Sequence, residues 1–266
     1  MKILVCAKQV PEVTNVQVDP ETGTLNRDGV ASILNPFCEY AMDLALELKE
    51  AEPDGEVEIV VLSMGPPQAR AALLRCLEMG GDSAILVTDR KFAGADTWAT
   101  ALTICKIIEK LDGVDLILVG KHAIDGDTAQ TGPMLAELLN IPQITYGVGL
   151  ELDERKKRVR VRRENEGGFE RVQMRMPGLV SVSKGAASRR VCSFESILDA
   201  RAKDISVMTA DDLGLDEAEL GLQGSLTQVV KVFPPISKEA GRIVNGTDAI
   251  AAAHEVVGIL KEKHFV

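Results

Sequence analysis

Short apolar runs alternate with longer amphipathic stretches over the first half of this chain, and this alternation constrains its fold more than any other feature. The runs have the length of buried strands: ILVCA at 3–7, VEIVVLSM at 57–64, AILVT at 84–88 and VDLILVG at 114–120. Helical periodicity follows each of them, at 37–50, 66–81, 95–111 and 128–139. Strands that are apolar on both faces and joined by single helices form a parallel sheet covered by helices on both sides. The pattern predicts an α/β fold with a doubly wound, mostly parallel sheet.

Aromatic residues make up only 3% of the sequence and hydrophobic residues 45%, so the core should be aliphatic. The helix at 37–50 should bury one face, formed by Phe37, Ala41, Leu44, Ala45 and Leu48. The helix at 95–111 should bury a stripe of Trp98, Ala101, Leu102, Cys105 and Ile108. Asp96 precedes that stripe and is placed to cap the helix.

The pattern changes between residues 150 and 183, where the sequence predicts an antiparallel ribbon. Valines and methionines alternate with arginines on either side of a Glu166-Gly167-Gly168 turn. The simplest interpretation is a half-buried hairpin with a solvated basic face. The net charge of -10 disfavours nucleic acid as its ligand.

After residue 200 the sequence becomes acidic and glycine-rich, with a break at FPP (233–235) and one amphipathic helix near 247–263. We expect a domain at 1–200, which includes the hairpin at 156–176, and a C-terminal arm at 201–266 that packs on another subunit.

Several classes of function are disfavoured. No apolar run is long enough for membrane insertion, and the start MKILVCAKQV looks like a strand rather than a signal peptide. The five cysteines are scattered, which is typical of reduced thiols in a cytoplasmic protein, and the three histidines are dispersed. We expect no metal site and no catalytic side chain. Neither G-x-G-x-x-G nor a Walker motif is present.

The stretch GKHAIDGDTAQTGP at 120–133 joins a strand to a helix, the kind of junction at which α/β proteins hold phosphates. Gly126 permits a tight turn, including one with a positive φ angle. Asp127 or Thr128 should cap the helix, with Thr131 and Gly132 in its first turns. Two interpretations stay open here: a cap alone, or a diphosphate site made of free N–H groups and threonine hydroxyls.

These residues resemble the β subunit of electron transfer flavoproteins over essentially the whole chain. Four features carry the resemblance: the start KILVCAKQVP with the D-x-x-T-G-x-L-x-R-D-G segment (19–29) and Asn35-Pro36-Phe37-Cys38; the loop at 120–133; VRRENEGGFERVQMRMPGLVSV at 161–182; and GLQGSLTQVVKVFPP at 221–235. The resemblance implies a Rossmann-like domain of the adenine-nucleotide-binding type. It also implies an obligate heterodimer with an α subunit that carries its own FAD.

The resemblance leaves two nucleotides open for this subunit. One group of β subunits holds a structural AMP, with a loop closer to D-D-D-C-N-Q-T-G. A second group bifurcates electrons and holds FAD, with a loop like D-G-D-T-A-Q-x-G-P. Gly126, Thr128 and the stretch FAGADTWAT at 92–100 match the second group, so FAD is favoured over AMP.

For such a subunit the resemblance implies that NADH reduces the FAD. One electron then goes to ferredoxin or flavodoxin, and the other goes through the α-subunit FAD to an acyl-CoA-type dehydrogenase. The protein would only position the flavin and tune its potential.

The family's nucleotide contacts map onto four segments. The expected cofactor-binding residues are Cys6, Ala7, Lys8, Asn35, Pro36, Phe37, Cys38, Met64, Gly65, Asp96, Thr97, Thr100, Gly120, Lys121, His122, Ala123, Ile124, Asp125, Gly126, Asp127, Thr128, Ala129, Gln130 and Thr131. Simpler roles remain for some of them: a surface charge for Lys8, and helix caps for Asn35, Asp96 and Thr97. Trp98 could pack in the core or stack on the flavin.

The segment 187–203 matches the family's partner-docking loop, with Phe194 at the anchor position and Ile197 beside it. Phe194 as a buried aromatic at a helix start is the competing interpretation. Glu164 matches a hairpin glutamate that contacts a partner, and an ion pair with a neighbouring arginine competes with that role.

Three other functions compete: an AMP-holding carrier without bifurcation, a nucleotide-binding stress or signalling module, and an adenylate-forming enzyme. The enzyme would need an S-G-G-x-D-like loop after the first strand, where this chain has KQVPEVTN.

Overall fold

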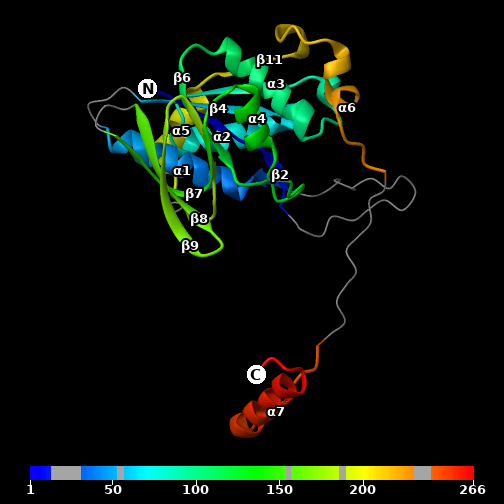
Figure 1. Cartoon of the computed structure of the whole chain (residues 1–266). Helices are drawn as coiled ribbons and strands as arrows, with labels where there is room; N and C mark the ends of the chain where they lie inside the picture. The colour runs from blue at the N-terminus through cyan, green and yellow to red at the C-terminus, as the bar shows by residue number, and fades with distance from the viewer. Residues whose placement is uncertain (13–30, 53–56, 154–156, 186–189, 231–240) are drawn as a thin grey trace. The chain divides into compact units, whose positions relative to one another are not determined.

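The structure is a computed structural model, and it describes residues 1–12, 31–52, 57–153, 157–185, 190–230 and 241–266. A nine-stranded sheet forms its centre, in the order β11-β5-β4-β1-β6-β10-β7-β8-β9 (Figure 1). The strands are β1 (Lys2–Cys6), β4 (Glu58–Met64), β5 (Ser83–Val87), β6 (Val114–Gly120), β7 (Gln143–Leu152), β8 (Arg158–Asn165), β9 (Gly168–Arg175), β10 (Gly178–Val182) and β11 (Ile205–Met208). All neighbours pair in parallel except β7–β8 and β8–β9. The predicted α/β fold is confirmed.

A separate antiparallel pair, β2 (Gln9–Pro11) and β3 (Ser32–Leu34), follows β1. The resemblance segment at 19–29 lies between these strands, outside the described residues.

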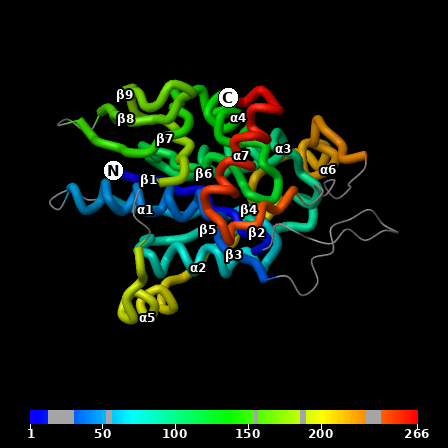
Figure 2. The backbone as a smooth tube through the Cα atoms, turned by 90° about the horizontal axis from the view of Figure 1, so that it is seen from below, coloured from blue at the N-terminus to red at the C-terminus, as the bar shows by residue number. Residues whose placement is uncertain are grey.

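Helices cover both faces of the parallel part of the sheet. The helices α1 (Pro36–Glu50), α2 (Arg70–Met79) and α5 (Phe194–Ala202) share one aliphatic cluster with the sheet and lie on the same side of it (Figure 2). The helices α3 (Thr97–Lys110) and α4 (Thr131–Leu138) share the second cluster. Successive side chains of β1 point to opposite faces of the sheet, so Ile3 and Val5 pack in the first cluster and Leu4 packs in the second.

The buried stripe of α3 differs from the expected one. Ala101, Ile104, Cys105 and Ile108 are buried, whereas Trp98 and Leu102 are only partly buried. Ala99, Thr103 and Ile107 are buried as well, so the buried surface of α3 is wider than one stripe, and Trp98 lies at the first turn. In α1 the buried face contains Ala41, Leu44, Ala45 and Leu48 as expected, but Phe37 is partly exposed.

The predicted ribbon is correct for β7, β8 and β9, and residues 166–167 form the turn between the last two. It is wrong for residues 178–182, which form β10 and pair in parallel with β6 and β7. Pro177 has no N–H group with which to continue the ladder. The five residues of β10 are buried on both faces, as in a central parallel strand.

The first compact unit reaches Lys231, which is further than the expected end at residue 200. Ile205, Ala210, Leu213 and Leu220 are buried, and β11 extends the sheet beside β5. Short helices connect the elements of this unit: η1 (Pro67–Ala69), η2 (Arg90–Phe92), η3 (Ala210–Asp212), η4 (Glu217–Glu219) and α6 (Gly221–Gly224).

The second unit begins at Val232 and contains α7 (Ala249–Glu262). Asp248 caps this helix by accepting hydrogen bonds from the N–H groups of Ile250 and Ala251. None of the helix residues is buried, and the apolar side chain of Ile250 is 74% exposed. Among the described residues, no helix is long and apolar enough to cross a membrane.

Candidate functional site

The predicted nucleotide residues gather at the carboxyl ends of β1, β4 and β6. After β1 the chain turns to one side of the sheet through α1, and after β6 it turns to the other side through α4. Strands β1 and β6 are neighbours in the sheet, so their outgoing loops diverge at the strand ends. We refer to the place where they diverge as the crevice. Ligands of open α/β sheets bind at this topological position. The sheet therefore brings together, at one edge, segments that lie far apart in the sequence.

The loop after β6 begins with a turn at residues 123–127. The carbonyl of Ala123 accepts hydrogen bonds from the N–H groups of Gly126 (3.3 Å) and Asp127 (2.8 Å). Asp127 and Ala129 have positive φ angles of 49° and 55°, so the left-handed positions are not at Gly126. A Cβ atom added at Gly126 would meet nothing within 4 Å. The glycine is thus not required by the protein's own packing.

Asn35 holds this loop from the end of β3. Its side chain is almost completely buried; it donates to the carbonyl of His122 (2.9 Å) and accepts from the N–H of Ile124 (3.2 Å). Asn35 also occupies the N-cap position of α1, as the alternative expected, but its side chain makes no capping hydrogen bond to the helix. Two backbone groups of the loop depend on this one amide.

Each of the two aspartates of the loop has a basic side chain as its partner. Lys8 contacts both carboxylate oxygens of Asp125, at 2.8 and 3.0 Å, so it is not a free surface charge. Nδ1 of His122 lies 2.9 Å from Asp127, and the His122 ring packs edge-on against Phe37. Both aspartates therefore order the loop rather than supply an acid–base pair.

The helix α4 starts at Thr131, and Thr131 and Gly132 occupy its first turn as expected. The expectation that Asp127 or Thr128 caps it is wrong: Gln130 is the N-cap residue, and within the described chain no side chain makes a capping hydrogen bond. The left-handed conformations of Asp127 and Ala129 interrupt the chain before the helix, which starts three residues after Thr128. Backbone donors at this helix start remain available to an anion.

The start of α3 lies beside the start of α4, since the hydroxyl of Thr97 is 3.2 Å from the amide oxygen of Gln130. Thr100 lies one turn further along α3. Asp96 caps α3 by accepting from the N–H of Ala99, as predicted. Its other oxygen accepts from the N–H and hydroxyl of Thr227. No sequence motif predicts this link to the C-terminal segment.

The remaining predicted residues line the strand ends. Cys6 ends β1 and is followed by Ala7 and Lys8, and Met64 ends β4 and is followed by Gly65. After β6, the N–H of Lys121 donates to the carbonyl of Val182. A Cβ atom at Gly120 would lie 2.8 Å from that of Phe37, so α1 starts in close contact with β6. Burial, and then the neighbouring Cys38, raises the pKa of the Cys6 thiol to about 12. Cys6 is therefore neutral and unsuited to act as a nucleophile.

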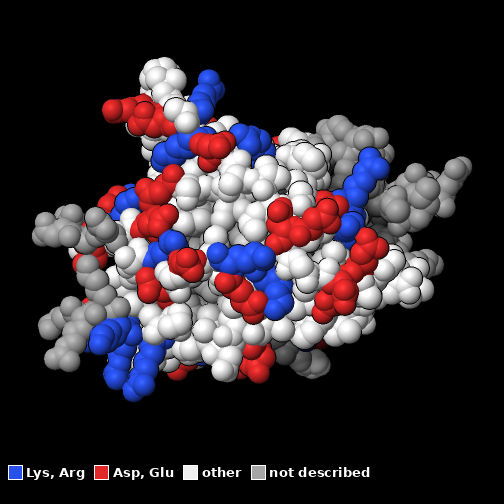
Figure 3. Space-filling model, turned by 90° about the horizontal axis from the view of Figure 1, so that it is seen from above, with Lys and Arg blue, Asp and Glu red and all other residues white. Residues whose placement is uncertain are grey.

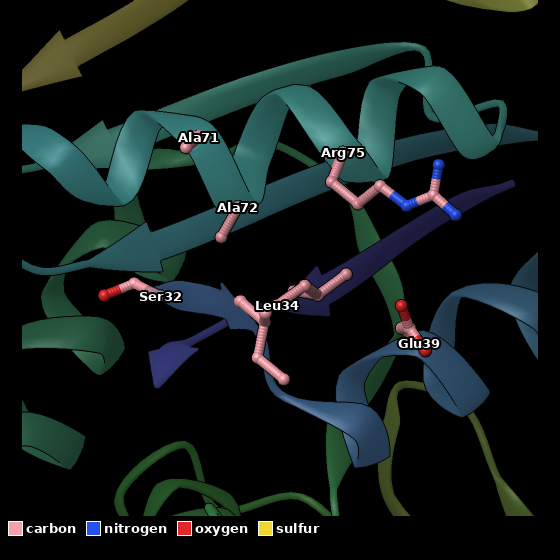
Figure 4. A pocket seen from close by; sticks show the side chains of 7 residues that line it. Ser32, Leu34, Glu39, Ala71, Ala72 and Arg75 are labelled. Carbon is pink, nitrogen blue, oxygen red and sulfur yellow. The ribbon is translucent and has the colours of Figure 1, made fainter. Parts of the chain in front are cut away.

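Two other kinds of site are not formed here. The described residues contain no group of histidine, cysteine and acidic side chains that could hold a metal ion. A cavity of about 240 Å³ lies between β3, α1 and α2, and Leu34, Ala72 and Arg75 are among its lining residues (Figure 4). It contains none of the predicted nucleotide residues, and its volume is below the ~300 Å³ lower end of small-molecule sites.

The predicted docking segment leads into α5. Phe194 is the first residue of this helix and is 76% exposed, so the buried interpretation is wrong. Ile197 is partly buried one turn later. Glu164 accepts a hydrogen bond from the hydroxyl of Ser183 and makes no arginine ion pair among the described residues. Phe194 is thus free to meet a partner.

Arg190 fixes the start of that segment to α1. Its guanidinium pairs with Glu50 and lies 3.8 Å from Asp43, a fully buried carboxylate with no hydrogen-bond partner. The proximity of Arg190 to Asp43 is not predicted by any motif; its one sequence signal is an aspartate within the apolar helix of 37–50. Burial raises the pKa of Asp43 to about 6, and the charge of Arg190 only partly opposes that rise.

The raised pKa of Asp43 predicts a specific pH dependence of stability. The folded pKa exceeds the ordinary value of 3.8, so the ionised group disfavours folding above pH 6, and this penalty is lost as the pH falls from 6 towards 4. Asp43→Asn should raise the free energy of unfolding by about 1–3 kcal/mol at pH 7 and by almost nothing near pH 4. Urea titrations at both pH values measure the difference. A gain of equal size at the two pH values would contradict the assignment.

Comparisons with known proteins identify the family of the chain. The family model described as "Electron transfer flavoprotein domain" matches residues 22–213. The chain is 43% identical over 266 residues to the caffeyl-CoA reductase-Etf complex subunit CarD of Acetobacterium woodii, with all of both chains covered. It is 44% identical over 266 residues to the electron transfer flavoprotein subunit beta of Clostridium acetobutylicum, again with full coverage. The acryloyl-CoA reductase electron transfer subunit gamma of Anaerotignum propionicum is 36% identical over 274 residues, also over the full length of both. The chain therefore belongs to the electron transfer flavoprotein family, among its β subunits.

Proposed function

We propose that this chain binds FAD at the loop of residues 120–131 and is the bifurcating β subunit of an electron transfer flavoprotein. One observation carries the proposal. The first half of the loop is held by Asn35, at His122 and Ile124, and by Lys8, at Asp125. The loop has open space at Gly126 and enters a helix whose first turn lacks a side-chain cap. Such a cradle has the donors and the room that a diphosphate needs.

The residues of the crevice fit a dinucleotide. N–H groups around Thr131 and the hydroxyl of Thr128 would hold the diphosphate, and the ends of β1 and β4 would flank the adenosine. Once bound, FAD would supply hydride acceptance and one-electron transfer. The protein would orient it and exclude water. No side chain of the crevice is needed as a nucleophile or base.

Structural AMP, the alternative ligand, would not extend to the start of α3. The Thr97–Gln130 contact brings α3 and α4 together at the crevice, so Thr97 and Thr100 lie where a longer ligand could continue. This arrangement and the open Gly126 position favour FAD.

The relatives support the assignment of partners. Two of them are named as subunits of CoA-ester reductase systems. By analogy we propose an α subunit as the obligate partner and an acyl-CoA-type dehydrogenase as the high-potential acceptor. Ferredoxin or flavodoxin would be the low-potential acceptor, NADH the donor and the cytoplasm the location. The exposed apolar side chains of α7 suit an arm that packs on the α subunit.

An acceptor-dependence assay tests the proposed reaction. The purified αβ complex should oxidise NADH rapidly only when ferredoxin (or flavodoxin) and the dehydrogenase with its substrate are both present. Oxidation that needs the dehydrogenase alone would instead indicate a simple carrier.

Phe194→Ala should weaken transfer to the dehydrogenase, because an exposed aromatic at the centre of a docking surface contributes much of the binding energy. We expect at least a tenfold rise in the KM for the dehydrogenase, an unchanged unfolding temperature and unchanged reduction of the flavins by NADH. Stopped-flow reduction and steady-state assays separate these effects. Loss of both activities would place docking elsewhere.

A further inference from the structure

The outer face of the hairpin β8–β9 carries five arginines. Arg158, Arg160 and Arg162 alternate along β8, and Arg171 and Arg175 along β9. In the antiparallel register Arg158 is directly opposite Arg175, and Arg162 is opposite Arg171. All five side chains belong to exposed residues. The other face of the hairpin holds Val159, Val161 and Met174, which belong to the cluster under α1.

This arrangement is costly for the sheet by itself. Like charges directly opposite each other on neighbouring strands destabilise the pairing. Within the described chain none of the five guanidinium groups makes an ion pair. The carboxylates near them are Glu151, opposite Arg160, Asp153 just after β7, and Glu164, which follows Arg162 on the same face and accepts a hydrogen bond from the hydroxyl of Ser183. The second aliphatic cluster, under α3 and α4, contains no residue of β8 or β9, so these helices leave the face open.

The concentration of positive charge contrasts with the rest of the molecule. The chain as a whole has a net charge of -10. Over most of the face shown in Figure 3, basic and acidic side chains are interspersed. A segregated basic face on an acidic protein attracts carboxylates locally, whereas the whole molecule repels long polyanions such as nucleic acid.

An aromatic side chain lies at the tip of the same face. Phe169 is opposite Glu164 on β9, is 63% exposed, and has the Arg162 guanidinium 5.1 Å from its ring centroid. Arginine and exposed aromatic side chains are the types enriched in protein–protein interfaces, and guanidinium groups match carboxylates in bidentate geometry.

We propose that this arginine face, formed by the five arginines and Phe169, docks an acidic surface of a protein partner. It lies on the opposite side of the sheet from α5, so its partner binds independently of the Phe194 surface. Carboxylates of the partner pair with the guanidinium groups, and an apolar patch receives Phe169. The inference does not depend on which nucleotide the crevice holds.

The test compares two variants that lose the same charge. Arg162→Gln with Arg171→Gln removes two charges from the face; the control, Arg90→Gln with Lys110→Gln, removes two exposed charges elsewhere. The probe is a fluorescein-labelled peptide of alternating glutamate and alanine, titrated by fluorescence anisotropy into the full chain in the complex in which it purifies. We expect about tenfold weaker binding for the face variant only, and an affinity that falls with salt.

The unfolding temperature provides a second readout. It should not fall in the face variant, because an opposed pair of like charges has been removed. Equal loss of peptide binding in both variants would overturn the proposal, as would tighter binding of a DNA duplex of matched charge. Self-association of the wild type that the face variant abolishes would assign the face to a second copy. Unchanged peptide binding with aggregation of the face variant would show that the arginines only protect the edge strand β9.

Discussion

Asn35→Ala should release the bound nucleotide and lower the free energy of unfolding by about 2–4 kcal/mol, because it leaves the His122 carbonyl and the Ile124 N–H without their partner. Both groups belong to the loop that enters α4. Without the amide, the loop should lose its fixed shape, and the donors at the helix start would no longer point to one place. Urea titration and nucleotide content of the purified protein measure the two effects.

Asn35→Asp provides the matched control. At neutral pH a carboxylate in this buried position can accept from Ile124 but sets a second acceptor against the His122 carbonyl, so we expect losses of stability and nucleotide at least as large as in Asn35→Ala. Full nucleotide content in Asn35→Ala would show that the loop does not depend on this residue.

Gly126→Leu should also lose nucleotide but leave the fold intact. Nucleotide retention should fall at least tenfold, whereas the free energy of unfolding of the nucleotide-free protein should change by less than about 0.5 kcal/mol. A Cβ atom at this position meets no protein atom within 4 Å, so we expect the leucine side chain to enter the space assigned to the ligand. The nucleotide that remains after gel filtration, and the unfolding temperature of the apoprotein, measure the two effects.

Gly126→Ala, which adds a single methyl group, should retain more nucleotide than Gly126→Leu. Normal nucleotide content in the leucine variant would mean that the diphosphate does not approach Gly126. A loss of apoprotein stability would mean that the glycine serves the fold after all.

Much of the fold could be predicted because its strands are short, apolar runs bounded by helical periodicity. Residues 178–182 were misassigned because the strand follows a ribbon directly, and local alternation does not show which neighbour a strand pairs with. Residues 205–208 were assigned to the arm because an edge strand with two exposed residues carries a weak signal.

The candidate site could be predicted in its position but not in its contacts. The strand-to-helix junction at 120–133 can be recognised in the sequence because glycine, aspartate and threonine residues separate an apolar run from a helical stretch. The bond between Asn35 and Ile124 joins residues 89 apart, and that between Asp96 and Thr227 joins residues 131 apart. Such pairs follow from the sheet order, which a single sequence does not determine. The capping residues were misassigned for a local reason, since Asp127 and Ala129 adopt left-handed backbone angles that favour glycine.

The nucleotide content of the purified αβ complex tests the central claim most directly. Denaturation releases bound nucleotides, and chromatography against FAD and AMP standards identifies and counts them. We expect two FAD per αβ dimer, one in each subunit, and no AMP. One FAD with one AMP per dimer would contradict the claim.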